Sequence, residues 1–95
     1  DSIDKSKIIT LISPKWTMKD KLILVEAPGI QTIRGWVDES KINEVIIDEK
    51  VIQINADSTF SYNIFVKKEA KEVRIIGNKN GKKIKSIIFT IKIED

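Results

Sequence analysis

Residues 33–62 read IRGWVDESKINEVIIDEKVIQINADSTFSY, and apolar side chains recur in this stretch at every second position. A period of two is typical of a β-strand with one buried face, because successive side chains of a strand point to opposite sides. Polar turn residues interrupt the pattern, so the stretch predicts a series of short strands joined by turns. The residues that define the alternation are Ile33 and Val37, Val45 and Ile47, Ile52 and Ile54, and Phe60 and Tyr62.

The same pattern continues on both sides of this stretch and predicts about seven to eight short strands. Four consecutive apolar residues in segment 21–27 fit either a short buried strand or one helical turn, and we favour the strand. Short strands at regular spacing, with no amphipathic helix, are typical of a β-sandwich. The strands are expected at residues 7–13, 21–27, 30–38, 45–47, 51–54, 59–66, 72–78 and 83–93.

The composition sets limits on size and class. Ninety-five residues form one domain, since a separate hydrophobic core needs on the order of 50 to 200 residues. The chain is 41% hydrophobic and 33% charged, which suits a folded domain rather than a disordered one. We expect residues 1–7 to be a linker and residues 8–95 to form the sandwich, and the abrupt polar ends indicate a segment of a longer protein.

An ordered set of residues carries a likeness to a known family. It comprises Ile33, Gly35, Val37 and Asp38, then Ile42, Val45 and Ile47, then Ile52 and Ile54, then Asp57-Ser58-Thr59-Phe60. This order resembles the bacterial immunoglobulin-like domains typified by domain B of glucodextranase, over residues 30–93. The chain has Asp48-Glu49 where that family usually has Asn-Gly, and Ser58 where it has Gly.

The resemblance implies an all-β, immunoglobulin-like antiparallel β-sandwich that acts as a spacer or accessory module. Such modules stand beside enzymes or binding domains in secreted or surface-attached bacterial proteins, so the resemblance implies an extracytoplasmic location. The expected partners are neighbouring domains of the parent chain, with another protein or a polysaccharide as further candidates.

Several chemistries are excluded by residue types that the sequence lacks. There is no histidine and no cysteine, so triads that use them, thiolate metal sites and disulfides cannot form. We therefore expect a non-enzymatic domain without a cofactor. The net charge of +3 is spread along the chain, which argues against a nucleic-acid surface. No apolar run approaches the roughly 18 residues of a membrane span.

One outward-facing aromatic residue is the main candidate for binding. If Ile33 and Val37 point inward, Trp36 points outward beside Arg34 and Thr32, and an exposed indole can stack on a sugar ring or anchor a protein. The alternative is that the N-terminal segment or an adjoining domain covers Trp36. Phe65 is also outward, so the candidate binding residues are Trp36, Arg34, Thr32 and Phe65.

Two further surface features follow from the alternation. Ile76 and Ile88 point outward like Phe65, and the three would form a wider apolar patch if their strands are neighbours. Asp38, Glu39 and Asp48 could gather at one end of the sandwich and bind calcium through carboxylate oxygens. We favour a structural reading for Asp38 and Asp48, in which the side chains stabilise turns, and we predict no metal site.

Overall fold

The computed structural model describes residues 7–13 and 21–94, and the linker expected at residues 1–7 therefore lies almost wholly outside the described residues. The described residues contain no helix, so none can cross a membrane as a helix. Segment 21–27 forms a strand, as predicted. The strands are β1 (Ile9–Ser13), β2 (Leu22–Val25), β3 (Gly29–Val37), β4 (Glu44–Ile47), β5 (Lys50–Ile52), β6 (Thr59–Val66), β7 (Lys71–Lys79) and β8 (Lys82–Ile93).

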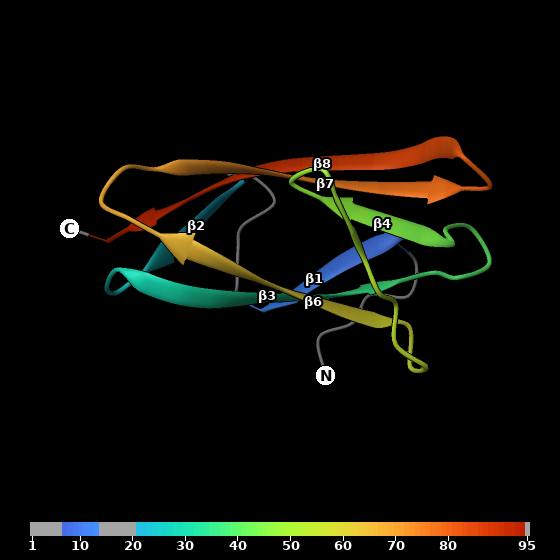
Figure 1. The fold of residues 1–95 in the computed structure, drawn as a ribbon, viewed down its shortest axis with the longest axis horizontal. Helices are drawn as coiled ribbons and strands as arrows, with labels where there is room; N and C mark the ends of the chain where they lie inside the picture. Colours follow the sequence, from blue (N-terminus) through green and yellow to red (C-terminus); the bar gives the residue numbers. More distant parts are fainter. Residues whose placement is uncertain (1–6, 14–20, 95) are drawn as a thin grey trace.

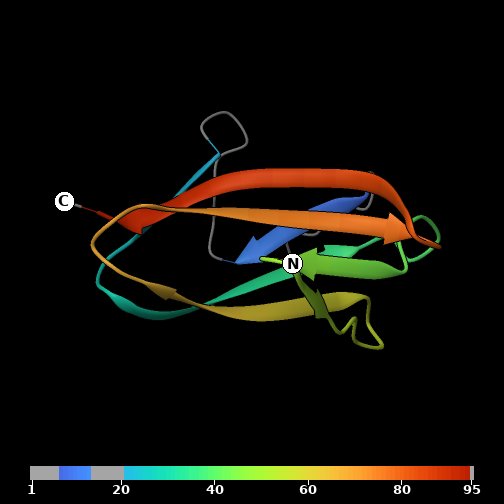
Figure 2. The same cartoon turned by 45° about the horizontal axis from the view of Figure 1, so that its top comes forward.

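The strands form two sheets that pack face to face as a β-sandwich (Figure 1). Sheet A has the order β1-β3-β6, and sheet B has the order β2-β8-β7-β4-β5. The prediction of an all-β sandwich is confirmed. One pair departs from the antiparallel expectation, because β2 runs parallel to β8 while every other described pair is antiparallel. The 45° view in Figure 2 shows β2 leading from the β8 side of the sandwich toward the start of β3.

Two hairpins are closed by two-residue turns whose backbone is left-handed at both positions. Asp48 and Glu49 join β4 to β5 with φ of 51° and 68°, and Asn80 and Gly81 join β7 to β8 with φ of 52° and 83°. Positive φ at both central residues is the geometry of a type I′ turn, which matches the twist of paired strands. Asp48-Glu49 thus adopts the turn geometry that favours Asn-Gly. Ser58, at φ of 70°, is also left-handed.

The second arm of the β4–β5 hairpin is shorter than predicted. The sequence pattern extends the strand to Ile54, but β5 ends at Ile52. Beyond this point the chain leaves sheet B and crosses to sheet A, where the Asn55 N–H donates to the Thr59 carbonyl at 2.8 Å. Ile54 still packs against the core although it belongs to no strand.

The core lies between the sheets and is built from the inward-facing residues of both. On β6, for example, Phe60, Ile64 and Val66 are buried, while Phe65 is exposed, as the alternation predicts. Ile42, in the β3–β4 connection, is fully buried as well. The buried apolar residues are Ile9, Ile23, Val25, Ile33, Val37, Ile42, Val45, Ile47, Phe60, Ile64, Val66, Val73, Ile75, Phe89 and Ile91.

Gly35 faces the core and leaves room for an aromatic ring. A Cβ atom at this position would lie 2.6 Å from Cε2 of Phe60 and 3.1 Å from the carbonyl oxygen of Thr10. Gly35 is paired directly with Phe60 across β3 and β6. The group that approaches Gly35 most closely is therefore the Phe60 ring.

Candidate functional site

The four candidate binding residues all lie on the outer face of sheet A. Thr32, Arg34 and Trp36 occupy alternate positions on β3, and Phe65 is on the neighbouring strand β6. Thr32, Arg34 and Phe65 are exposed, whereas Trp36 is only partly exposed. Sequence reasoning therefore placed the residues on the right side of the sheet. The sequence left open whether the indole is exposed or covered, and in the structure it is half-buried.

Trp36 stands in a row of the sheet with two buried threonines. It pairs with Thr10 on β1 and with Thr59 on β6, and each threonine is 8% exposed although both are on the outward side of their strands. Trp36 therefore has a buried residue beside it on each neighbouring strand. Residues 1–6, which the sequence suggested as a cover for Trp36, lie outside the described residues.

Trp36 and Phe65 stand at opposite ends of this face. Phe65 pairs with Ile30, six residues before Trp36 on β3, which corresponds to a separation of about 20 Å along the strand. Ile30 and Phe65 are 69% and 56% exposed, so they form an apolar pair open to solvent. The two aromatic residues cannot form a single cluster, and the surface between them is polar.

The polar middle of the face is held by a cross-strand hydrogen bond. The Thr32 hydroxyl donates to Oδ1 of Asn63 at 2.7 Å. Arg34 pairs with Ser61, and it contributes to the electrostatic environment of Asp57 at the start of β6. Hydrogen bonds from the hydroxyl and backbone N–H of Thr59 are the main cause that lowers the pKa of the exposed Asp57 carboxyl, and the Arg34 charge lowers it further.

The three carboxylates considered for calcium do not come together as a group. Asp38 accepts hydrogen bonds from the hydroxyl and backbone N–H of Ser40, which lower its pKa and close the turn after β3. Glu39 accepts a bond from the Ser58 hydroxyl at 2.8 Å. Asp48 follows the far end of β4 and forms an ion pair with Lys71 at 3.8 Å. Among residues 7–13 and 21–94, no cluster of acidic residues has the geometry of a metal site.

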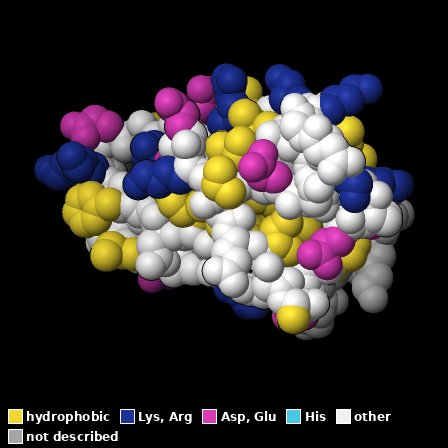
Figure 3. Space-filling view, turned by 45° about the vertical axis from the view of Figure 1, so that its right-hand side comes forward, with side chains coloured by type: hydrophobic (Ala, Val, Ile, Leu, Met, Phe, Trp, Pro, Cys, Tyr) yellow, Lys and Arg dark blue, Asp and Glu magenta, His cyan; other side chains and the backbone are white. Residues whose placement is uncertain are grey.

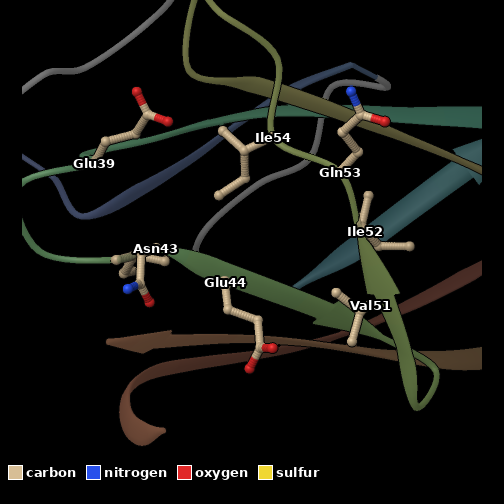
Figure 4. Close-up of a pocket in the computed structure, with 8 residues that line it drawn as sticks. Glu39, Asn43, Glu44, Val51, Ile52, Gln53 and Ile54 are labelled. Carbon is tan, nitrogen blue, oxygen red and sulfur yellow. The ribbon is translucent and has the colours of Figure 1, made fainter. Parts of the chain in front are cut away.

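A pocket of about 430 Å³ opens beside β4 and β5 (Figure 4). Figure 4 shows Glu39 and Ile54 on one side of it, with Glu44, Val51 and Ile52 on the other. Its two carboxylates already serve the fold, since Glu39 accepts from Ser58 and Glu44 accepts from Asn78 Nδ2 at 3.0 Å. Each of the two carboxylates is thus held by one side chain of a neighbouring segment.

The apolar patch expected from Phe65, Ile76 and Ile88 is wrong as a single surface. Phe65 lies on sheet A, whereas Ile76 and Ile88 lie on β7 and β8 of sheet B, so the residues are on opposite outer faces of the sandwich. Alternation along each strand correctly predicted that they point outward. It could not assign strands to sheets, because that depends on pairing between distant segments.

Sheet B has a different apolar row, which the sequence analysis missed. Val51, Ile46 and Ile76 are paired side by side across β5, β4 and β7 on its outer face, and Val51 is 67% exposed. Figure 3 shows hydrophobic side chains interspersed with charged ones on the face it presents. The signals in the sequence were the predicted outward direction of Ile76 and the unbroken apolar run at positions 45–47, in which the middle residue must face outward.

No family model matches the chain, and comparison with curated proteins and with solved structures gave no significant match.

Proposed function

We propose that the chain is a non-catalytic, immunoglobulin-like module that spaces and orients neighbouring domains in a bacterial extracytoplasmic protein. The observation that carries the proposal is the placement of the start of β1 and the end of β8. They lie toward opposite ends of the sandwich, so tension applied through the two termini acts along its long axis. The strand order and the chemistry of the surface support it as well.

The strand order is compatible with an immunoglobulin-like sandwich and supports this part of the proposal. With β1, β3 and β6 taken as strands A, B and E, and β4, β7 and β8 as C, F and G, the A, B and E strands share one sheet and the C, F and G strands share the other. β5 extends the second sheet beside C, as strand C′ does in variable-type domains. The left-handed backbone at Glu49 and Ser58 also occurs where the resembling family has glycine.

The surface chemistry supports a role without catalysis. The sequence has no histidine or cysteine, which removes the commonest general base and the thiol nucleophile. The carboxylates of Glu39 and Glu44 in the pocket are engaged by Ser58 and Asn78. What remains is a stiff β core with two broad outer faces.

The start of β1 and the end of β8 lie toward opposite ends of the sandwich, which is 40 Å long. Ile9 pairs with Val37 at the end of β3, whereas Ile93 pairs with Val25, shortly before β3 begins at Gly29. In Figure 1, β8 runs from the right-hand side of the molecule to the left and ends near the label C. A chain pulled from both termini would therefore be stretched along its long axis.

Tension along this axis acts on the parallel β2–β8 pair in shear. Hydrogen bonds from Thr90 N–H to the Lys21 carbonyl, at 2.9 Å, and from Glu94 N–H to the Val25 carbonyl, at 2.7 Å, cross this pair. Because β2 and β8 would slide along each other, these bonds must break together rather than in succession. The geometry suits a domain that carries load between its neighbours.

Single-molecule force spectroscopy tests this function through the direction of loading. We expect the domain pulled through its termini to unfold at a several-fold higher force than the same domain pulled between Glu49→Cys and Ala70→Cys. The second geometry opens β4 from β7 one residue pair at a time, starting at the end marked by the Asp48–Lys71 ion pair. The chain has no native cysteine, so the attachment points are unique.

Both measurements unfold the same domain, so they differ only in the direction of pulling. The unfolding force reports the barrier to unfolding rather than the equilibrium stability. Equal unfolding forces in the two directions would reject a load-bearing role. A higher force for the Glu49–Ala70 geometry would reject it as well.

Carbohydrate binding on the outer face of sheet A is the second candidate function. The specific observation in its favour is that Trp36 and Phe65 flank a polar strip containing Thr32, Arg34 and Asn63. Aromatic faces can stack on sugar rings, and polar groups between them can bind hydroxyls.

Affinity electrophoresis in soluble polysaccharides tests this alternative. If it holds, Trp36→Ala and Phe65→Ala each weaken retardation by a polysaccharide that the wild-type domain binds, whereas Val51→Ala, on the outer face of sheet B, leaves it unchanged. If neither neutral nor charged polysaccharides retard the wild-type domain, carbohydrate binding is rejected and the spacer function stands as the one proposal.

A further inference from the structure

Of the four outer edges of the two sheets formed by residues 7–13 and 21–94, the edge at β6 lacks the features that protect the other three. β1 has five residues and a register irregularity between Leu11 and Ser13, β2 has four residues, and β5 has three. β6 has eight residues, TFSYNIFV, in regular register with β3, and it contains no charge and no proline. Short length, bulges, charges and proline are the devices that keep edge strands from pairing with other chains.

The backbone groups on the free side of β6 can be assigned from two hydrogen bonds. The Ser58 carbonyl accepts from Val37 N–H at 3.0 Å, so the even-numbered residues that follow on β6 direct both backbone groups toward β3. The odd-numbered residues therefore face away, and the Thr59 carbonyl indeed accepts from Asn55 N–H on that side. The N–H and C=O groups of Ser61, Asn63 and Phe65 have no hydrogen-bond partner among the described residues.

We propose that β6 pairs with β6 of a second copy of this chain, antiparallel about a two-fold axis at Asn63. In this register Asn63 lies opposite Asn63, and Ser61 of each copy lies opposite Phe65 of the other. The unpartnered N–H and C=O groups of the three residues then satisfy one another with none left over. A two-fold axis requires such a self-complementary surface.

Charges at the ends of β6 favour this occupant and this direction. Asp57 precedes the strand, and Glu39 is bound to Ser58 at the same end. Lys67 and Lys68 follow the other end. Antiparallel pairing of two copies brings the acidic end of one near the basic end of the other, whereas parallel pairing would place like charges together. Two copies joined in this way share one continuous sheet with the order β1-β3-β6-β6-β3-β1.

Sedimentation velocity between low-micromolar and millimolar concentrations tests the proposal. We expect a weak, reversible dimer, because a single strand pair buries little surface. Asn63→Lys should raise the dissociation constant by about tenfold or more, since two like charges then face each other across the axis.

Thr32→Lys is the matched control. It adds the same charge to the same face and removes the same Thr32–Asn63 hydrogen bond, but on the inner strand β3. We expect it to leave the dissociation constant nearly unchanged. A second variant, Ser61→Lys, tests the same edge if Asn63→Lys does not fold.

Hydrogen exchange supplies an independent measurement of the pairing. In the dimer, the amides of Ser61, Asn63 and Phe65 should exchange more slowly as concentration rises, while the Val51 amide on β5 should not change. A protein that stays monomeric at millimolar concentration would overturn the proposal. So would a dimer weakened equally by Asn63→Lys and Thr32→Lys.

Discussion

Replacing Gly35 with alanine is expected to destabilise the domain by about 1–3 kcal/mol, because the new methyl group overpacks a filled core. Its Cβ would lie 2.6 Å from Cε2 of Phe60, and this ring is fully buried and pressed between the two sheets. The ring cannot move aside without displacing other core side chains. Chemical denaturation with urea measures the change in the free energy of unfolding.

A double-mutant cycle assigns this cost to the Phe60 ring. In a Phe60→Leu background the Gly35→Ala substitution should cost clearly less, because the smaller side chain leaves space for the methyl group. Gly77→Ala is a useful comparison, since its Cβ would meet mainly the flexible end of Ile42, 3.2 Å from Cγ1. An equal cost of Gly35→Ala in both backgrounds would show that the Phe60 contact is not the cause.

Ile42→Ala is expected to lower the free energy of unfolding by about 2–5 kcal/mol, the range for truncating a buried aliphatic side chain. Ile42 lies in the connection between β3 and β4, yet it is fully buried and covers Gly77 on β7. Thermal and urea unfolding measure the change. Lys41→Ala, the exposed neighbouring position, is the control and should change stability by less than about 0.5 kcal/mol.

The same site offers a compensating change. Adding Gly77→Ala to Ile42→Ala places a methyl group in the space that the isoleucine side chain occupied, so the double variant should recover part of the lost stability. If Ile42→Ala costs less than about 1 kcal/mol, the β3–β4 connection does not contribute to the core in the way its burial indicates.

The candidate site was only partly predictable, as Trp36 shows. The direction of its side chain follows from the sequence, but its exposure does not. Alternation on β3 assigns its outward direction, because Ile33 and Val37 must be buried. Its surroundings include Thr10 and Thr59, which reach the same row through the pairing of β3 with β1 and β6. That pairing is set by segments 26 and 23 residues away in the sequence, and no local pattern reports it.

The free edge at β6 was also only partly predictable from the sequence. The sequence shows that residues 59–66 form an uncharged alternating strand without proline. Whether such a strand is central or at an edge depends on the order of the strands in the sheet, and only this order exposes the backbone groups of Ser61, Asn63 and Phe65. Self-pairing at β6 therefore depends both on the residue types of the strand and on its position at the edge of sheet A.

The sequence by itself determined the all-β class, a number of strands close to the observed one, the inward face of the clearly alternating strands and the positions of most turns, because the period of two and the turn residues act over a few neighbouring residues. The tertiary structure alone decided which strands share a sheet, that β2 runs parallel to β8, and that Phe65 and Ile76 lie on opposite faces. These features depend on contacts between distant segments, where burial of the whole core selects one arrangement among many that satisfy the same local pattern.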